Sequence, residues 1–215
     1  RYVDFLVPNR FKHGYGLSPE IVNEAKAEKE PNLIITVDNG ISSNEGVALA
    51  RSLGIDVIIT DHHLPPKELP DANAIINPNL RGCDFPSKNL AGVGVCFYLF
   101  SSLKTHLDSI GYFEKNNIKV PDLRVLLDLV ALGTVADVVK LDQNNRILVN
   151  EGIKRIRQKK CSKGILAILE LTKRPIESIQ ASDLGFTVAP RINAAGRMSD
   201  ISQGIRCLLS EDIND

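Results

Sequence analysis

Short apolar runs recur along the first eighty residues, each too short for a helix. The runs at 32–37 and 56–60 are rich in β-branched side chains and predict strands, the second one buried on both faces. A similar run at 2–7 predicts a strand near the start of the chain, and 72–78 predicts a further, shorter one. The pattern therefore predicts a sheet in this part of the protein.

Helical signals lie between these runs. Ser18 can cap a helix that has Pro19 at its first position and continues through 20–30. A second helix is predicted at 43–54, where Gly54 ends it. Alternating strands and helices predict parallel strands joined by right-handed crossovers, which is an α/β layered sheet.

The pattern changes to helices beyond residue 90. Apolar residues at helical spacing predict helices at 91–107, 122–139, 145–158 and 164–172. The first two are apolar enough to pack against a sheet, and the second is expected to break at Gly133. We therefore predict an α/β parallel-sheet domain with flanking helices, followed by a mainly helical connecting region.

Composition limits the class of protein. The 215 residues are 43% hydrophobic and 24% charged, which is typical of a globular protein of one large or two small domains. We place the domains at 1–140 and 141–215. No apolar run approaches the roughly 20 residues of a membrane helix, so we expect no membrane contact. The four cysteines (Cys83, Cys96, Cys161 and Cys207) show no paired spacing, so we interpret them as reduced thiols of a cytoplasmic protein. The only methionine is Met198 and the chain opens inside a predicted strand, so we expect a piece of a longer protein.

Positive charge is concentrated in one stretch of a chain whose formal net charge is zero. Residues 146–174 hold nine basic side chains and only two acidic ones, an excess of seven positive charges. A solvated helix face and a surface that faces phosphates are both open explanations. The basic residues are Arg146, Lys154, Arg155, Arg157, Lys159, Lys160, Lys163, Lys173 and Arg174.

Candidate chemistry gathers where two predicted strands end. The strand at 32–37 is followed by Asp38, and the strand at 56–60 is followed by Asp61, His62 and His63. Ligands of open parallel sheets bind beyond the carboxyl ends of the strands, so these side chains are expected at one edge. Asp137 is a further candidate, because a carboxylate in the apolar run 122–139 would be costly without a partner.

Each of these signals has a simpler explanation when it is taken alone. The DNG sequence at Asp38 is typical of a tight turn. A hairpin, however, would need a second strand next, and the segment that follows, 43–54, is predicted to be a helix. His62 and His63 could be surface residues, and Asp137 could cap a helix. Their coincidence at one sheet edge favours a metal site, and Asp and His without Cys suit Mn²⁺ or Mg²⁺ better than Zn²⁺. The chain has no Walker loop, dinucleotide fingerprint or Gly-x-Ser-x-Gly elbow, so phosphoester chemistry with metals is the strongest interpretation.

Five ordered motifs extend over nearly the whole chain: VDNGIS, TDHHLP, NLAGVGVCFYL, ALGTVADVV and PRINAAGRM, with VPNRFKHGYGLSPE near the start. Together they resemble the DHH phosphoesterase superfamily and, within it, the RecJ family of bacterial single-stranded-DNA exonucleases. The resemblance implies a metal-dependent enzyme that hydrolyses single-stranded DNA from its 5′ end during recombination and repair. It also implies single-stranded DNA as the substrate, with a helicase and a single-strand-binding protein as candidate partners.

The resemblance implies a role for each matching residue. Asp38 would be shared between two metal ions, and His62 and Asp137 would bind one of them. His63 would lie beside the scissile phosphate. Asp61 would orient the loop that carries the histidines without binding the metal itself. The DNA phosphates would be held by Arg10, Arg191, Asn193 and Arg197.

The family pattern is longer than this chain. An Asp-rich motif and later domains of the family would lie beyond the two ends of this chain, so we expect the 215 residues alone to have little or no nuclease activity. Two alternatives stay open. One is a DHH phosphodiesterase or pyrophosphatase that acts on short or small substrates, and the other is a non-catalytic DHH scaffold.

Overall fold

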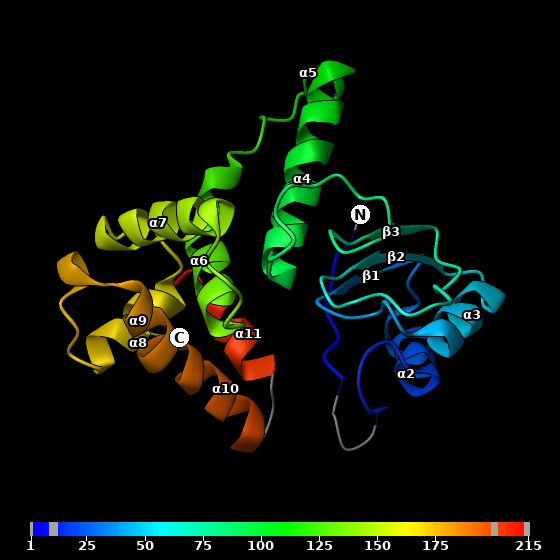
Figure 1. Cartoon of the computed structure of the whole chain (residues 1–215), viewed down its shortest axis with the longest axis horizontal. Coiled ribbons are helices and arrows are strands. Elements are labelled where there is room, and N and C mark those ends of the chain that lie inside the picture. Colours follow the sequence, from blue (N-terminus) through cyan, green and yellow to red (C-terminus); the bar gives the residue numbers. More distant parts are fainter. Residues whose placement is uncertain (1, 9–12, 199–201, 213–215) are drawn as a thin grey trace. The chain divides into compact units, whose positions relative to one another are not determined.

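The computed structural model describes residues 2–8, 13–198 and 202–212 (Figure 1). The chain forms two compact units, Arg1–Lys88 and Asn89–Asp215. The boundary predicted after residue 140 lies inside the second unit and stays a prediction. Among the described helices, none combines the length and the apolar character needed to cross a membrane.

The first unit is built on three parallel strands in the order β1-β2-β3. These strands are β1 (Leu33–Val37), β2 (Asp56–Thr60) and β3 (Ala74–Ile76). Helix α2 (Pro19–Lys29) precedes β1, and α3 (Asn44–Ser52) connects β1 to β2. The predicted parallel α/β sheet is confirmed, including its short third strand.

Both helices cover one face of this sheet. Side chains alternate between the faces of a strand, so Val57 and Ile59 point the same way, and both are fully buried. They form one core with Val22 of α2 and Val47 of α3, and Figure 1 shows the two helices on the same side of the sheet. Ile58, on the opposite face, is only half-buried, so the prediction of a strand buried on both faces holds for one face.

The helix ends follow the predicted signals. The Ser18 hydroxyl accepts a hydrogen bond from the Ile21 amide at 3.5 Å, and Pro19 is the first helical residue. Gly46 explains how closely α3 approaches the segment that leads into α2, because a Cβ on Gly46 would lie 1.9 Å from the Leu17 carbonyl oxygen. Only glycine allows this contact.

The strand predicted at 2–7 is not observed. Residues 2–8 form no sheet hydrogen bonds among the described residues, and Tyr2 and Val3 are 87% and 91% exposed. The residues favour extended chain, but a strand also needs a neighbour with which to pair. Preference alone cannot supply that neighbour.

The second unit is helical, as predicted. Buried side chains of several helices form its core, among them Ile156, Ile165, Leu169, Leu184 and Val188. The longer helices match the predicted segments. In chain order the elements are α4 (Gly92–Ser109), α5 (Tyr112–Lys115), η1 (Leu123–Leu126), α6 (Leu127–Ala136), α7 (Gln143–Arg157), α8 (Lys163–Leu171), η2 (Ile176–Ser178), α9 (Ala181–Asp183), η3 (Leu184–Val188), α10 (Ala189–Met198) and α11 (Ser202–Leu209).

Gly133 does not break a helix, contrary to the prediction. Helix α6 continues through it to Ala136, and Asp137 is the capping residue that follows. The glycine serves packing instead, because a Cβ there would lie 2.7 Å from Cγ1 of Val93 in α4. Asp137 is exposed at the helix end, so the apolar setting predicted for its carboxylate is also wrong.

Candidate metal centre

The site lies at the carboxyl ends of β1 and β2. Val37 pairs in register with Thr60, so Asp38 and Asp61 are the next residues on neighbouring strands. The Asp38 amide donates to the Thr60 carbonyl at 2.9 Å, and the Asp61 amide donates to the Ile76 carbonyl at 3.1 Å. Backbone hydrogen bonds of the sheet therefore fix the positions of Asp38 and Asp61 independently of their side chains.

The turn after β1 is held in an unusual conformation. Asp38 has φ +64°, a region that residues other than glycine rarely adopt and that is often found at functional sites. The Thr36 hydroxyl donates to the Asn39 carbonyl at 2.7 Å, and the Asn39 side-chain amide donates to the Val37 carbonyl at 2.8 Å. Helix α3 follows rather than a strand, so the DNG sequence forms a turn but no hairpin.

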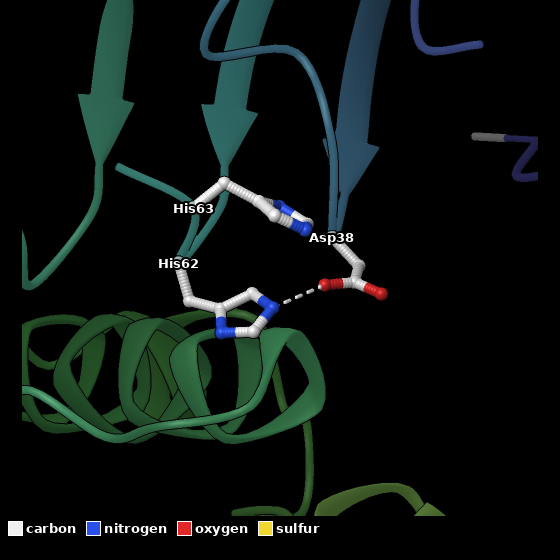
Figure 2. Close-up of side chains that lie close together, drawn as sticks. All are labelled: Asp38, His62 and His63. Atoms are coloured by element: carbon white, nitrogen blue, oxygen red, sulfur yellow. Dashed lines mark ion pairs between the residues drawn. The ribbon is translucent and has the colours of Figure 1, made fainter. Parts of the chain in front are cut away.

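Asp38, His62 and His63 come together at this edge (Figure 2). One ligand atom from each lies within 4.8 Å of those of the other two. His62 Nε2 and Asp38 Oδ1 are 2.9 Å apart, and the imidazole rings have centroids 4.5 Å apart. His62 is largely buried, whereas Asp38 and His63 are about half exposed, so the cluster has one side open to solvent.

Asp61 holds the backbone of the two histidines. It is 1% exposed, and its Oδ1 accepts hydrogen bonds from the amides of His62 at 2.7 Å and His63 at 3.1 Å. Its Oδ2 accepts from the Ile41 amide at 3.0 Å. Burial raises the pKa of this carboxyl, but the hydrogen bonds from Ile41, His63 and His62 outweigh burial and leave the pKa below its ordinary value.

Asp61 also fixes the orientation of the His63 ring. Its Oδ1 lies 2.7 Å from His63 Nδ1, and a carboxylate can only accept a hydrogen bond. Nδ1 therefore donates to Asp61, and Nε2 is the ring nitrogen left for a ligand, where its lone pair in the neutral ring can bind a metal. The predicted orienting role of Asp61 has this physical basis.

Two asparagines that the sequence patterns did not indicate complete the support. The Asn77 amide donates to the His63 carbonyl at 2.8 Å, and the Asn79 amide donates to the His62 carbonyl at 2.5 Å. Asn77 is buried and also accepts from the Asn79 backbone amide. The sequence signal was the NPN segment directly after β3, which places two amides at the same edge as the histidines.

The cluster fits a divalent metal ion. Asp38 Oδ1 is buried and accepts no hydrogen bond of good geometry from the described residues, although His62 Nε2 is 2.9 Å away. Two ligand atoms this close together can bind the same ion, and one carboxylate with two imidazoles suits Mn²⁺. These residues are therefore a chemically consistent metal-binding set.

The other predicted residues lie elsewhere. Asp137, Arg191 and Asn193 belong to the second unit, where each is exposed. Arg197 lies in α10, but its side chain is outside the described residues, and so is the whole of Arg10. The structure brings together Asp38, His62, His63 and Asp61, and the roles of the rest stay predictions.

Comparison with known proteins defines the class. Residues 1–134 match the model of the DHH family, N-terminal domain, and the chain belongs to the DHH family. Within it, the chain is similar to the single-stranded-DNA-specific exonuclease RecJ of several bacteria. It is 61% identical to the Escherichia coli protein over 99% of this chain and 37% of that protein, and 41% identical to the Bacillus subtilis protein over 98% of this chain and 25% of that protein.

Solved structures agree with this relationship and with the predicted fold class. Exonuclease RecJ bound to manganese matches with a TM-score of 0.78 and 33% identity, over 97% of this chain and 49% of that chain. RecJ from Thermus thermophilus in complex with Mn²⁺ matches with a TM-score of 0.71 and 34% identity, over 91% of this chain and 27% of that chain. The chain thus spans less than half the length of the proteins that it matches.

Proposed function

We propose that this chain forms the metal-binding part of an exonuclease that hydrolyses single-stranded DNA from its 5′ end. The observation that supports this most strongly is the cluster of Asp38, His62 and His63 at the ends of two parallel strands. The similarity to RecJ proteins over 99% of the chain supports the substrate and the reaction. Structures of such relatives carry Mn²⁺ or Mg²⁺, and we propose the same ions here.

In this proposal each residue at the sheet edge has a separate task. Asp38 and His62 would hold the metal. The family pattern adds Asp137 as a ligand and has Asp38 shared between two ions. When bound, Mn²⁺ or Mg²⁺ would act as a Lewis acid and lower the pKa of water. His63 would lie beside the scissile phosphate, because Asp61 binds Nδ1 and leaves Nε2 free to donate to the phosphate when it carries a proton.

Arginine and asparagine side chains would position the strand. Arg191 and Asn193 are exposed on α10 and can contact phosphate oxygens, as can Arg10 and Arg197 in the family pattern. A helicase and a single-strand-binding protein are the proposed partners in recombination and repair, since such an enzyme needs an opened strand. The proposed location is cytoplasmic.

A length series on the natural full-length protein tests the proposal. Single strands of 2 to about 50 nucleotides, labelled at either end, are compared with duplexes and with pyrophosphate in Mn²⁺. We expect long single strands to be degraded to mononucleotides from the 5′ end, and duplexes and pyrophosphate to be poor substrates. A preference for dinucleotides or pyrophosphate would instead support the small-substrate alternative, and absence of any hydrolysis would support the scaffold.

A further inference from the structure

One stretch of the second unit departs from regular helix. Between α9 and α10, η3 is π-helical over Leu184–Val188. Such stretches are rare and often occur at functional sites. This one directly precedes the PRINAAGRM motif, which begins at Pro190.

The π-helical stretch presents an aromatic ring to solvent. Leu184, Thr187 and Val188 are buried, which anchors the backbone, whereas Phe186 is 83% exposed. Exposed phenylalanine gives up the stabilisation that burial would provide, and a ring on an anchored backbone is suited to contact a ligand.

A guanidinium follows on the next helix, α10. Arg191 is exposed, and its Nη1 donates to the Thr187 carbonyl at 2.8 Å, so the side chain lies back along the helix toward the turn that carries Phe186. This bond uses one of five N–H donors, and the others can bind an anion. No acidic residue lies in the first turn of α10, and the carboxylate of Asp183 is already engaged by the Gln180 amide and by Arg174.

We propose that Phe186 is a stacking platform for a base of single-stranded DNA and that Arg191 binds the neighbouring phosphate. A nucleotide in a single strand offers both an exposed base face and an anionic group, whereas a duplex hides its base faces. Aromatic side chains next to basic ones bind single strands in this way without reading their sequence. This proposal rests on the proposed nuclease function and adds a contact for the base.

Binding to two matched strands tests the proposal. The affinity of the natural full-length protein for a dT20 strand and for a fully abasic strand of equal length is measured by fluorescence anisotropy in EDTA, which prevents cleavage. Phe186→Ala should weaken dT20 binding by roughly 5- to 100-fold and leave abasic binding unchanged, and Phe186→Tyr should restore dT20 binding. Leu171→Ala is the matched control, since Leu171 is an 82% exposed apolar residue on α8 of the same unit.

The outcomes separate this proposal from the proposed function. If Phe186→Ala binds dT20 normally, or loses equal affinity for both strands, the stacking role is wrong while the nuclease assignment stands. A lower melting temperature of Phe186→Ala would mean that the ring packs against protein, and this too would overturn the proposal. If wild-type protein neither binds nor degrades single strands, the proposed function itself fails.

Discussion

The two units place their candidate functional residues by different means. In residues 1–88, Asp38 and Asp61 are positioned by backbone hydrogen bonds of the sheet, at 2.9 and 3.1 Å, and the side chains meet as a consequence. In residues 89–215, Arg191 and Asn193 are exposed on a helix. Neighbouring parallel strands bring their ends together whatever side chains they carry, whereas a helix positions a residue only relative to the surface against which it packs. A site made from strand ends can therefore be inferred from sequence order alone.

The largest effect should come from Asp38→Ala. The substitution removes the negative charge that would balance a divalent cation beside His62. In the natural full-length protein we therefore expect nuclease activity to fall about a thousandfold, within the several kcal/mol that metal-ion catalysis supplies. Calorimetry should show Mn²⁺ binding lost together with activity. Asp56→Ala is the matched control, since Asp56 lies at the opposite end of β2. Retention of activity within tenfold by Asp38→Ala would contradict the assignment.

Asp61→Asn should have the next largest effect. A carboxamide offers a single acceptor oxygen where the carboxylate accepts from the amides of Ile41, His62 and His63 and from His63 Nδ1. We expect Mn²⁺ affinity to fall about 10- to 100-fold, as is usual when a partner of a ligand is changed. Calorimetry on the natural protein, with Asp56→Asn as control, measures this. Unchanged affinity would mean that Asp61 does not orient the histidines.

The same variant should show a specific pH dependence of stability. The folded pKa of Asp61 lies below the unfolded value of about 3.9, so its contribution is fully present above that value and is lost as the pH falls through the folded pKa. The difference in unfolding free energy between wild type and Asp61→Asn should be constant near pH 7 and shrink below about pH 4. Urea unfolding across this range measures it, and a difference that grows in acid would refute the hydrogen-bonding account.

The residues missed or wrongly placed by sequence patterns share one physical cause. Asn77 and Asn79 could not be assigned before β3 was known to lie beside β2, because their partners are backbone carbonyls of the next strand end. The run 2–7 had the composition of a strand but no pairing partner among the described residues. Gly133 was predicted to break its helix because glycine has a low helix propensity. Its role is set instead by Val93, which packs against it from another helix. Contacts distant in sequence decided each case.

Glycine-to-alanine substitutions test whether close helix contacts maintain both units. A Cβ at Gly46 would lie 1.9 Å from the Leu17 carbonyl oxygen in the first unit, and a Cβ at Gly152 would lie 2.2 Å from that of Leu127 in the second. Each variant should lower the free energy of unfolding by about 1–3 kcal/mol in urea denaturation. Gly94→Ala is the control, because its methyl meets only the end of the Leu90 side chain at 3.1 Å. Equal costs for all three would contradict backbone crowding as the cause.

The smallest effect on stability is expected from loss of a surface ion pair of α7. Its cost, compared with that of Gly152→Ala, shows how much charge and packing each stabilise the second unit. Lys154 and Glu151 are 2.7 Å apart at i,i+3 spacing, and both side chains are about half exposed. Such pairs stabilise a helix by only about 0.2–0.5 kcal/mol, so Glu151→Gln should cost about this much in 0.1 M salt and nothing measurable in 1 M salt. A cost as large as that of Gly152→Ala would show that charge contributes to this unit as much as packing does.

The same variant also tests the basic stretch, because it leaves Lys154 without its carboxylate. Tighter single-strand binding by Glu151→Gln at low salt would favour the explanation that the basic stretch faces phosphates. Unchanged binding would favour a solvated face.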